Sequence, residues 1–141
     1  MHLGAGLARA HGVVVDPGQA LHLGQEVLEG RDIVVALVIG DRVQGRAQDH
    51  AAQVEDVIIT HLHYDHAGTV GDFPKAKFYL QDREMAFATG RNMTHKTFNG
   101  AFALDYVIDV IRKVYDNRVV FVDGTMEVAP GVSVHHVGGH T

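Results

Sequence analysis

The sequence has no cysteine among its 141 residues, which excludes disulfides, thiolate metal ligands and cysteine nucleophiles. It has no excess of positive charge, since its formal net charge is -5, and this leaves no electrostatic footprint for nucleic acid. No stretch approaches the ~18 consecutive apolar residues of a membrane span. The first residues show no basic leader followed by a sustained apolar run, as a signal peptide would. We therefore expect a soluble cytoplasmic protein.

The composition is that of an ordinary soluble domain. Hydrophobic residues make up 46% of the chain and charged residues 21%. A chain of this length forms one domain and is long enough to bury a hydrophobic core. Metal ligation, if present, must come from oxygen and nitrogen atoms, and the 11 histidines supply many candidate nitrogens.

Three histidines and an aspartate lie within six residues, directly after the apolar run 57–59. Such a run is typical of a buried strand. His61 and His63 are two residues apart, so in extended backbone their side chains point the same way. Asp65 and His66 follow where the chain turns and can face a second point nearby. Imidazole and carboxylate groups suit zinc and similar metals. The alternative is a polar loop that happens to be rich in histidine.

The rest of the chain predicts strands that alternate with helices. We expect strands at residues 13–15, 33–39, 54–60, 77–80, 119–122, 125–129 and 132–137. We expect helices at residues 19–32, 65–70, 82–88 and 102–116. Residues 89–101 are expected to be irregular, and Asp123-Gly124 resembles a hairpin turn. This alternation predicts an α/β or α+β fold. His140 then follows a strand, as His61 does, so two strand ends can deliver ligands to one metal.

Two segments resemble the signatures of the metallo-β-lactamase superfamily, the αββα-fold metallohydrolases. They are residues 60–68 (THLHYDHAG) and residues 137–141 (VGGHT). The resemblance covers residues 54–141, which we expect to form the metal-binding part, and it is poor over residues 1–53. The family pattern continues past the last residue with a metal-bridging aspartate and a further histidine. We therefore expect a metallo-β-lactamase-like sandwich truncated to about its first half, incomplete at the C-terminus.

The resemblance also implies a set of metal ligands. By that resemblance His61, His63 and His140 hold a first zinc ion, while Asp65 and His66 contribute to a second. Three histidines on one zinc leave a fourth position for water, whose pKa falls from 15.7 to about 7. A second metal can clamp the other side of the reacting group. Alternatively, Asp65 acts catalytically by carrying a proton to the leaving group.

These features predict a zinc-dependent hydrolase of small-molecule esters, lactones, thioesters or amides. The residues flanking the motifs resemble the N-acyl homoserine lactonase branch, which implies quorum quenching by attack of metal-bound hydroxide on a lactone ring. A glyoxalase II-like thioester hydrolase is the alternative enzyme. A third hypothesis is an inactive metal-binding fragment, because the ligands expected after residue 141 are missing from the sequence. Exposed core surface in such a half-domain would favour homo-oligomers.

Overall fold

The structure, a computed structural model, describes residues 8–10, 13–15, 26–28, 31–36 and 51–141. The strands are β1 (Ala8–Ala10), β2 (Val13–Val15), β3 (Glu26–Leu28), β4 (Arg31–Ala36), β5 (Asp56–Ile59), β6 (Lys77–Gln81), β7 (Val119–Val122), β8 (Thr125–Ala129) and β9 (Val132–His135). The α-helices are α2 (Tyr64–Ala67), α3 (Asp82–Ala88), α4 (Lys96–Asn99) and α5 (Leu104–Tyr115). Two 3₁₀ turns, η1 (Val70–Asp72) and η2 (Arg91–Thr94), complete the described elements.

The strands form two sheets. The larger sheet has the order β3-β4-β5-β6-β7, and every neighbouring pair from β4 to β7 is parallel. The smaller sheet has the order β1-β2-β9-β8 and is antiparallel throughout. Parallel strands require crossover connections, and the helical segments between β5 and β7 supply them.

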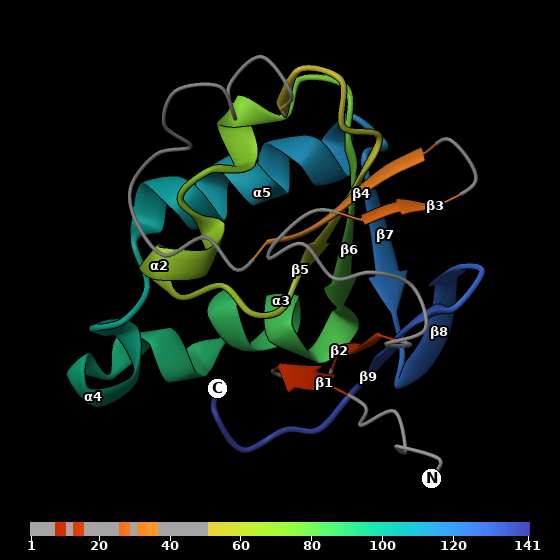
Figure 1. The fold of residues 1–141 in the computed structure, drawn as a ribbon. Coiled ribbons are helices and arrows are strands. Elements are labelled where there is room, and N and C mark those ends of the chain that lie inside the picture. The colour runs from red at the N-terminus through yellow and green to blue at the C-terminus, as the bar shows by residue number, and fades with distance from the viewer. Residues whose placement is uncertain (1–7, 11–12, 16–25, 29–30, 37–50) are drawn as a thin grey trace, which may run out of the picture.

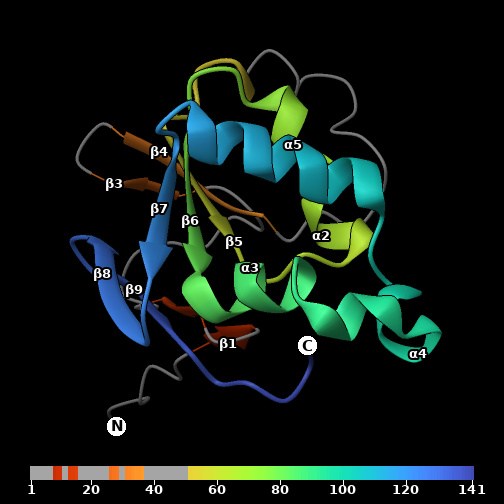
Figure 2. The same cartoon turned by 180° about the vertical axis from the view of Figure 1, so that it is seen from behind.

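Strand β5 lies at the centre of the larger sheet and is buried along its whole length. Val57 and Ile59 belong to the core under the helices, which includes Val110 of α5. Ile58, on the alternate face, packs in a second core with Val134 of β9. The molecule therefore has three layers: the helices, the larger sheet and the smaller sheet. Helix α5 lies on one side of the larger sheet, and β8 and β9 lie on its other side (Figures 1 and 2).

Most of the predicted elements are confirmed. Strands form at 13–15 and 119–122 as expected, and the strand expected at 77–80 extends one residue further, to Gln81. Helix α3 begins and ends where the sequence predicts. The amphipathic helix expected at 102–116 is α5. Mixed helices and parallel strands confirm the predicted fold class. None of the helices within the described ranges is long and apolar enough to cross a membrane.

The helix expected at residues 19–32 is wrong where the structure describes it. Glu26–Leu28 is strand β3, which pairs antiparallel with the start of β4, and Arg31 already belongs to that strand. The loose apolar face of this segment suited a helix, but pairing with a neighbouring strand outweighs such a weak local preference. Residues 19–25 of the prediction, and residues 37–39 of the strand expected at 33–39, lie outside the described ranges.

Two connections also differ from expectation. Asp123-Gly124 does not close a hairpin, because β7 belongs to the larger sheet and β8 to the smaller one. Gly124 has a φ of 81°, a conformation that glycine adopts readily, and the chain changes sheets there. Residues 89–101, expected to be irregular, contain η2 and α4, two short helical segments held by local backbone hydrogen bonds.

Candidate metal centre

The motif loop begins at the carboxyl end of β5, where parallel sheets commonly place their sites. Ile59 ends the strand, and the extended residues that follow lead into α2 at Tyr64. His61 is buried, with only 4% of its surface exposed, whereas His63 is half-buried. His61 therefore lies beneath the protein surface, whereas His63 is partly exposed to solvent.

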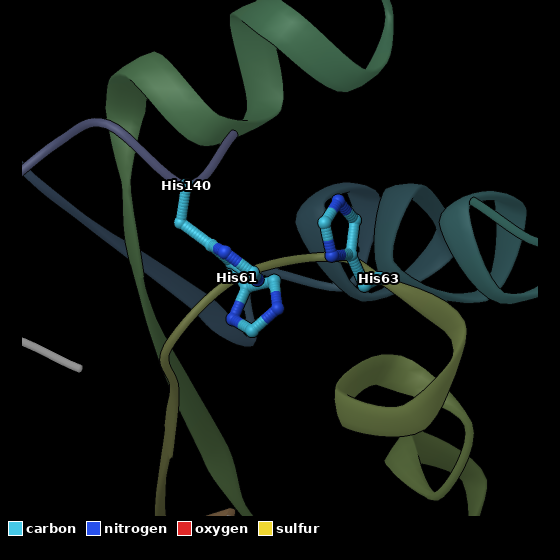
Figure 3. A group of neighbouring side chains, drawn as sticks. All are labelled: His61, His63 and His140. Carbon is cyan, nitrogen blue, oxygen red and sulfur yellow. The ribbon is translucent and has the colours of Figure 1, made fainter. Parts of the chain in front are cut away.

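The structure brings His61 and His63 together with His140, which is exposed and follows β9. Their ring centroids lie 4.6 Å apart for His61 and His63, 4.6 Å for His61 and His140, and 4.9 Å for His63 and His140. One nitrogen of each ring lies within 4.8 Å of the others. The three side chains lie together between the loop after β5 and the segment after β9 (Figure 3). This donor set fits a divalent metal such as zinc, which takes three histidines readily.

A second group contains His61 again, together with Asp65 and His66 from α2. The Asp65 carboxylate lies 3.6 Å from Nε2 of His66. His66 is buried, while almost half of the Asp65 side chain is exposed. The five residues that the sequence analysis selected therefore form two adjoining groups, with His61 common to both, and their role as ligands remains a prediction.

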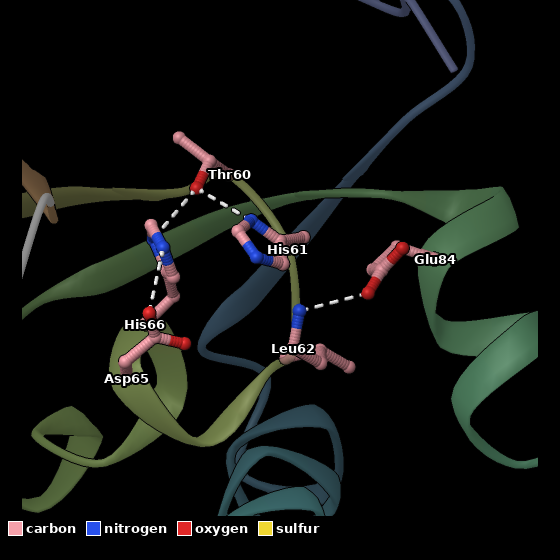
Figure 4. Close-up of polar contacts among 6 residues, drawn as sticks. All are labelled: Thr60, His61, Leu62, Asp65, His66 and Glu84. Carbon is pink, nitrogen blue, oxygen red and sulfur yellow. Dashed lines mark hydrogen bonds and ion pairs between the residues drawn. The ribbon is translucent and has the colours of Figure 1, made fainter. Parts of the chain in front are cut away.

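Thr60 contacts a histidine of each kind, His61, which both groups share, and His66, which belongs to the second group only. Its Oγ1 lies 3.1 Å from Nδ1 of His61 and 3.1 Å from Nδ1 of His66 (Figure 4). A hydroxyl oxygen has two lone pairs, so it can accept both Nδ1–H groups at once. In that tautomer Nε2 of each imidazole is the nitrogen available as a metal ligand. The sequence analysis placed Thr60 in the motif but gave it no role.

The surroundings of His61 and His63 favour the neutral form of these two imidazoles. Burial, and then the nearby His66, His63 and His140, lower the pKa of His61 from 6.5 to about 3. Burial and the neighbouring His140 also lower the pKa of His63, while the charge of Glu84 acts in the opposite direction. Neutral imidazole is the form that binds metals, so His61 needs no deprotonation near pH 7.

Sequence reasoning missed Glu84. This residue of α3 is buried, and its Oε1 accepts a 2.7 Å hydrogen bond from the backbone N–H of Leu62 (Figure 4). Its Oε2 accepts a hydrogen bond from the hydroxyl of Thr141. A glutamate in the first turn of a helix is common for its favourable interaction with the helix dipole, so the sequence carries no sign of these distant contacts.

An aromatic ring and a cavity adjoin the group of histidines. The ring of Phe102 packs edge-on against His63, with centroids 4.8 Å apart, and sequence reasoning missed this contact too. A cavity of about 320 Å³ opens beside His61 and His140. Its walls combine apolar side chains, such as Phe87 and Val134, with polar ones, such as Gln81 and Arg83.

A comparison with protein families matches residues 8–141 to the family described as the metallo-beta-lactamase superfamily. The family match therefore begins at residue 8, whereas the resemblance found in the sequence analysis begins only at residue 54. No curated protein matches the sequence.

Solved structures with the same fold include a quorum-quenching N-acyl homoserine lactone hydrolase, 18% identical, with a TM-score of 0.62 over 83% of this chain and 50% of that one. A B. thuringiensis AiiA variant with N-decanoyl-L-homoserine bound is 20% identical, with a TM-score of 0.58 over 83% and 53%. An N-acyl homoserine lactone hydrolase with bound N-hexanoyl-L-homoserine is 20% identical, with a TM-score of 0.56 over 92% and 63%. This chain thus spans 50–63% of the length of these three proteins.

Proposed function

This chain belongs to the metallo-β-lactamase superfamily, a group of metal-dependent hydrolases, and we propose that it binds zinc and takes part in hydrolysis of a lactone. The observation that carries the proposal is the convergence of His61, His63 and His140, which come from two distant segments, on one point. Asp65 and His66 adjoin this point and would hold a second metal. A bound divalent metal supplies Lewis acidity toward a carbonyl oxygen and lowers the pKa of water.

The chain's own residues perform three tasks in this proposal. His61 and His63 present neutral nitrogens from a loop fixed at the end of a buried strand. Asp65 keeps its carboxylate partly exposed beside the histidines, where it can hold a metal or receive a proton and pass it to the leaving group. The apolar part of the walls of the adjoining cavity, which includes Phe87 and Val134, would exclude water from the acyl portion of a substrate.

The preference for a lactone rests on the residues that flank the motifs and on the fold shared with N-acyl homoserine lactone hydrolases. The flanking residues resemble that branch of the superfamily most closely, and the cavity beside His140 suits a ligand with an apolar arm. The zinc-loaded protein should therefore open the ring of an N-acyl homoserine lactone, and His61→Ala should abolish this turnover.

The assay compares turnover of N-acyl homoserine lactones with turnover of S-lactoylglutathione by the same zinc-loaded preparation. Ring opening releases a proton, so a pH-stat reports it directly. His95→Ala is a matched control, because the exposed His95 belongs to neither group of candidate ligands and does not line the cavity. Activity on S-lactoylglutathione alone would contradict the lactonase proposal and indicate a glyoxalase II-like hydrolase. Zinc binding without either activity would support a metal-binding protein that is not an enzyme by itself.

A further inference from the structure

Glu84 is not one of the candidate metal ligands, yet its carboxylate is buried and contacts the segments that carry them. Only 6% of its surface is exposed, and both carboxylate oxygens accept hydrogen bonds. A buried carboxylate is costly unless its oxygens are paired in this way. The donors lie 22 and 57 residues away along the chain, so neither contact arises from local helix geometry.

Both partners of Glu84 are immediate neighbours of candidate ligands. Leu62 stands between His61 and His63, and its backbone N–H is the donor to Oε1. Thr141 follows His140, and its hydroxyl is the donor to Oε2. One carboxylate therefore holds the two segments that bring the three histidines together. The C-terminal segment passes close to α3 in both views of the fold (Figures 1 and 2).

Both hydrogen bonds of Glu84 are of a kind that restrains the position of the donor segment. Hydrogen bonds to an ionised carboxylate are shorter and roughly twice as strong as those between neutral groups. The bond to Leu62 acts on the backbone, so it restrains the path of the loop itself, whereas side-chain contacts restrain only single rotamers. Glu84 sits on a helix whose other buried residue, Ala88, belongs to the core, which gives the carboxylate a fixed support.

We propose that Glu84 is a positioning residue for the metal centre, which sets the spacing between the loop that carries His61 and His63 and the segment that carries His140. This inference rests on the proposed function, because it takes these three histidines as metal ligands. The negative charge of the carboxylate also favours a cation nearby. Groups that orient metal ligands from outside typically change metal affinity by about 10- to 100-fold when they are removed.

The test measures Co²⁺ affinity, by competition with a chromophoric chelator, and the visible absorption spectrum of the bound Co²⁺. Glu84→Ala removes both links, and we expect its affinity to fall by about 10- to 100-fold with an altered spectrum. Glu84→Gln keeps an acceptor for Leu62 and should recover part of the affinity. Asp82→Asn is the matched control, because Asp82 is an exposed carboxylate on the same helix, and its affinity should equal that of the wild type.

A second pair of variants isolates the link to the His140 segment. Thr141→Val removes the donor to Oε2 and leaves the bond to Leu62 in place, so Co²⁺ affinity should fall less than in Glu84→Ala. Thr141→Ser keeps the hydroxyl and should restore the affinity. This pair also decides the question if Glu84→Ala does not fold, since Thr141 is exposed and substitution of an exposed side chain usually changes stability little.

The outcomes separate the two proposals. Wild-type affinity and spectrum in folded Glu84→Ala, or in Thr141→Val if the former is unfolded, would overturn the positioning role and leave the metal site standing. A lower melting temperature with unchanged Co²⁺ affinity would also overturn it, because Glu84 would then serve folding alone. If the wild-type protein binds no Co²⁺, the metal site and the role of Glu84 both fail.

Discussion

Thr60 contacts two candidate ligands, His61 and His66, through its single hydroxyl. Removal of the hydroxyl should break its contacts with Nδ1 of His61 and with Nδ1 of His66. We predict that Thr60→Val, which keeps the shape of the side chain, lowers zinc affinity by about 10-fold or more. Thr60→Ser should keep the wild-type affinity, measured for both variants by calorimetric titration. Equal affinities for the valine and serine variants would remove Thr60 from the site.

His61 makes the stability of the metal-free protein depend on pH. Its pKa is lowered from 6.5 to about 3 in the folded protein, chiefly by burial, so the unfolded chain takes up this proton first as the pH falls. The free energy of unfolding should therefore decrease as the pH drops through that interval, and the contribution of His61 is fully present only above about pH 6.5.

This pH dependence is measured by urea unfolding of the protein in chelator, between neutral pH and about pH 3. Carboxylates also titrate there, so the comparison is with His61→Gln, which cannot take up this proton. The variant should lose less stability over the interval than the wild type. Parallel curves for the two proteins would show that His61 titrates normally.

At the scale of elements, β6 shows how strongly the sheet depends on its buried side chains. Leu80 of β6 is 1% exposed, whereas Leu104 at the start of α5 is 72% exposed. Leu80→Ala should lower the free energy of unfolding by about 2–5 kcal/mol, because it leaves a cavity in the core. Leu104→Ala is the matched control and should change it by less than about 0.5 kcal/mol. Denaturant unfolding of both variants checks the difference.

The elements that the sequence predicts well are those with strong local patterns. The apolar run of β5 and the helical spacing of apolar residues in α5 are visible without any structure. Strand β3 was missed because its three residues gain their structure from pairing with β4, a contact that no local pattern reveals. The change of sheets at Gly124 was missed for the same reason.

The residues of the candidate site also differ in how far the sequence could predict them. His61, His63, Asp65 and His66 lie close together in the chain, so their spacing alone marks them. His140 was found through a resemblance to a known family. Glu84 has no such signal, because its contacts with the loop and with the last segment exist only in the folded chain.

For the whole molecule, the site joins segments from different layers. His61 and His63 follow β5 of the larger sheet, while His140 follows β9 of the smaller one. A metal bound by all three would therefore tie the two sheets together and stabilise the folded state. At a free zinc concentration 100 times the Kd, the expected gain is about 2.7 kcal/mol. Thermal unfolding with zinc and with chelator should show this as a higher melting temperature, absent in His61→Ala.

The central claim, that His61, His63 and His140 hold a metal, is tested most directly by the metal content of the purified protein. Mass spectrometry of the wild type should find about one zinc ion per chain, or about two if the group with Asp65 and His66 also fills. His61→Ala should lose this zinc, since His61 belongs to both groups. A wild-type protein that takes up no metal after incubation with zinc, or a His61→Ala variant that keeps it fully, would contradict the account.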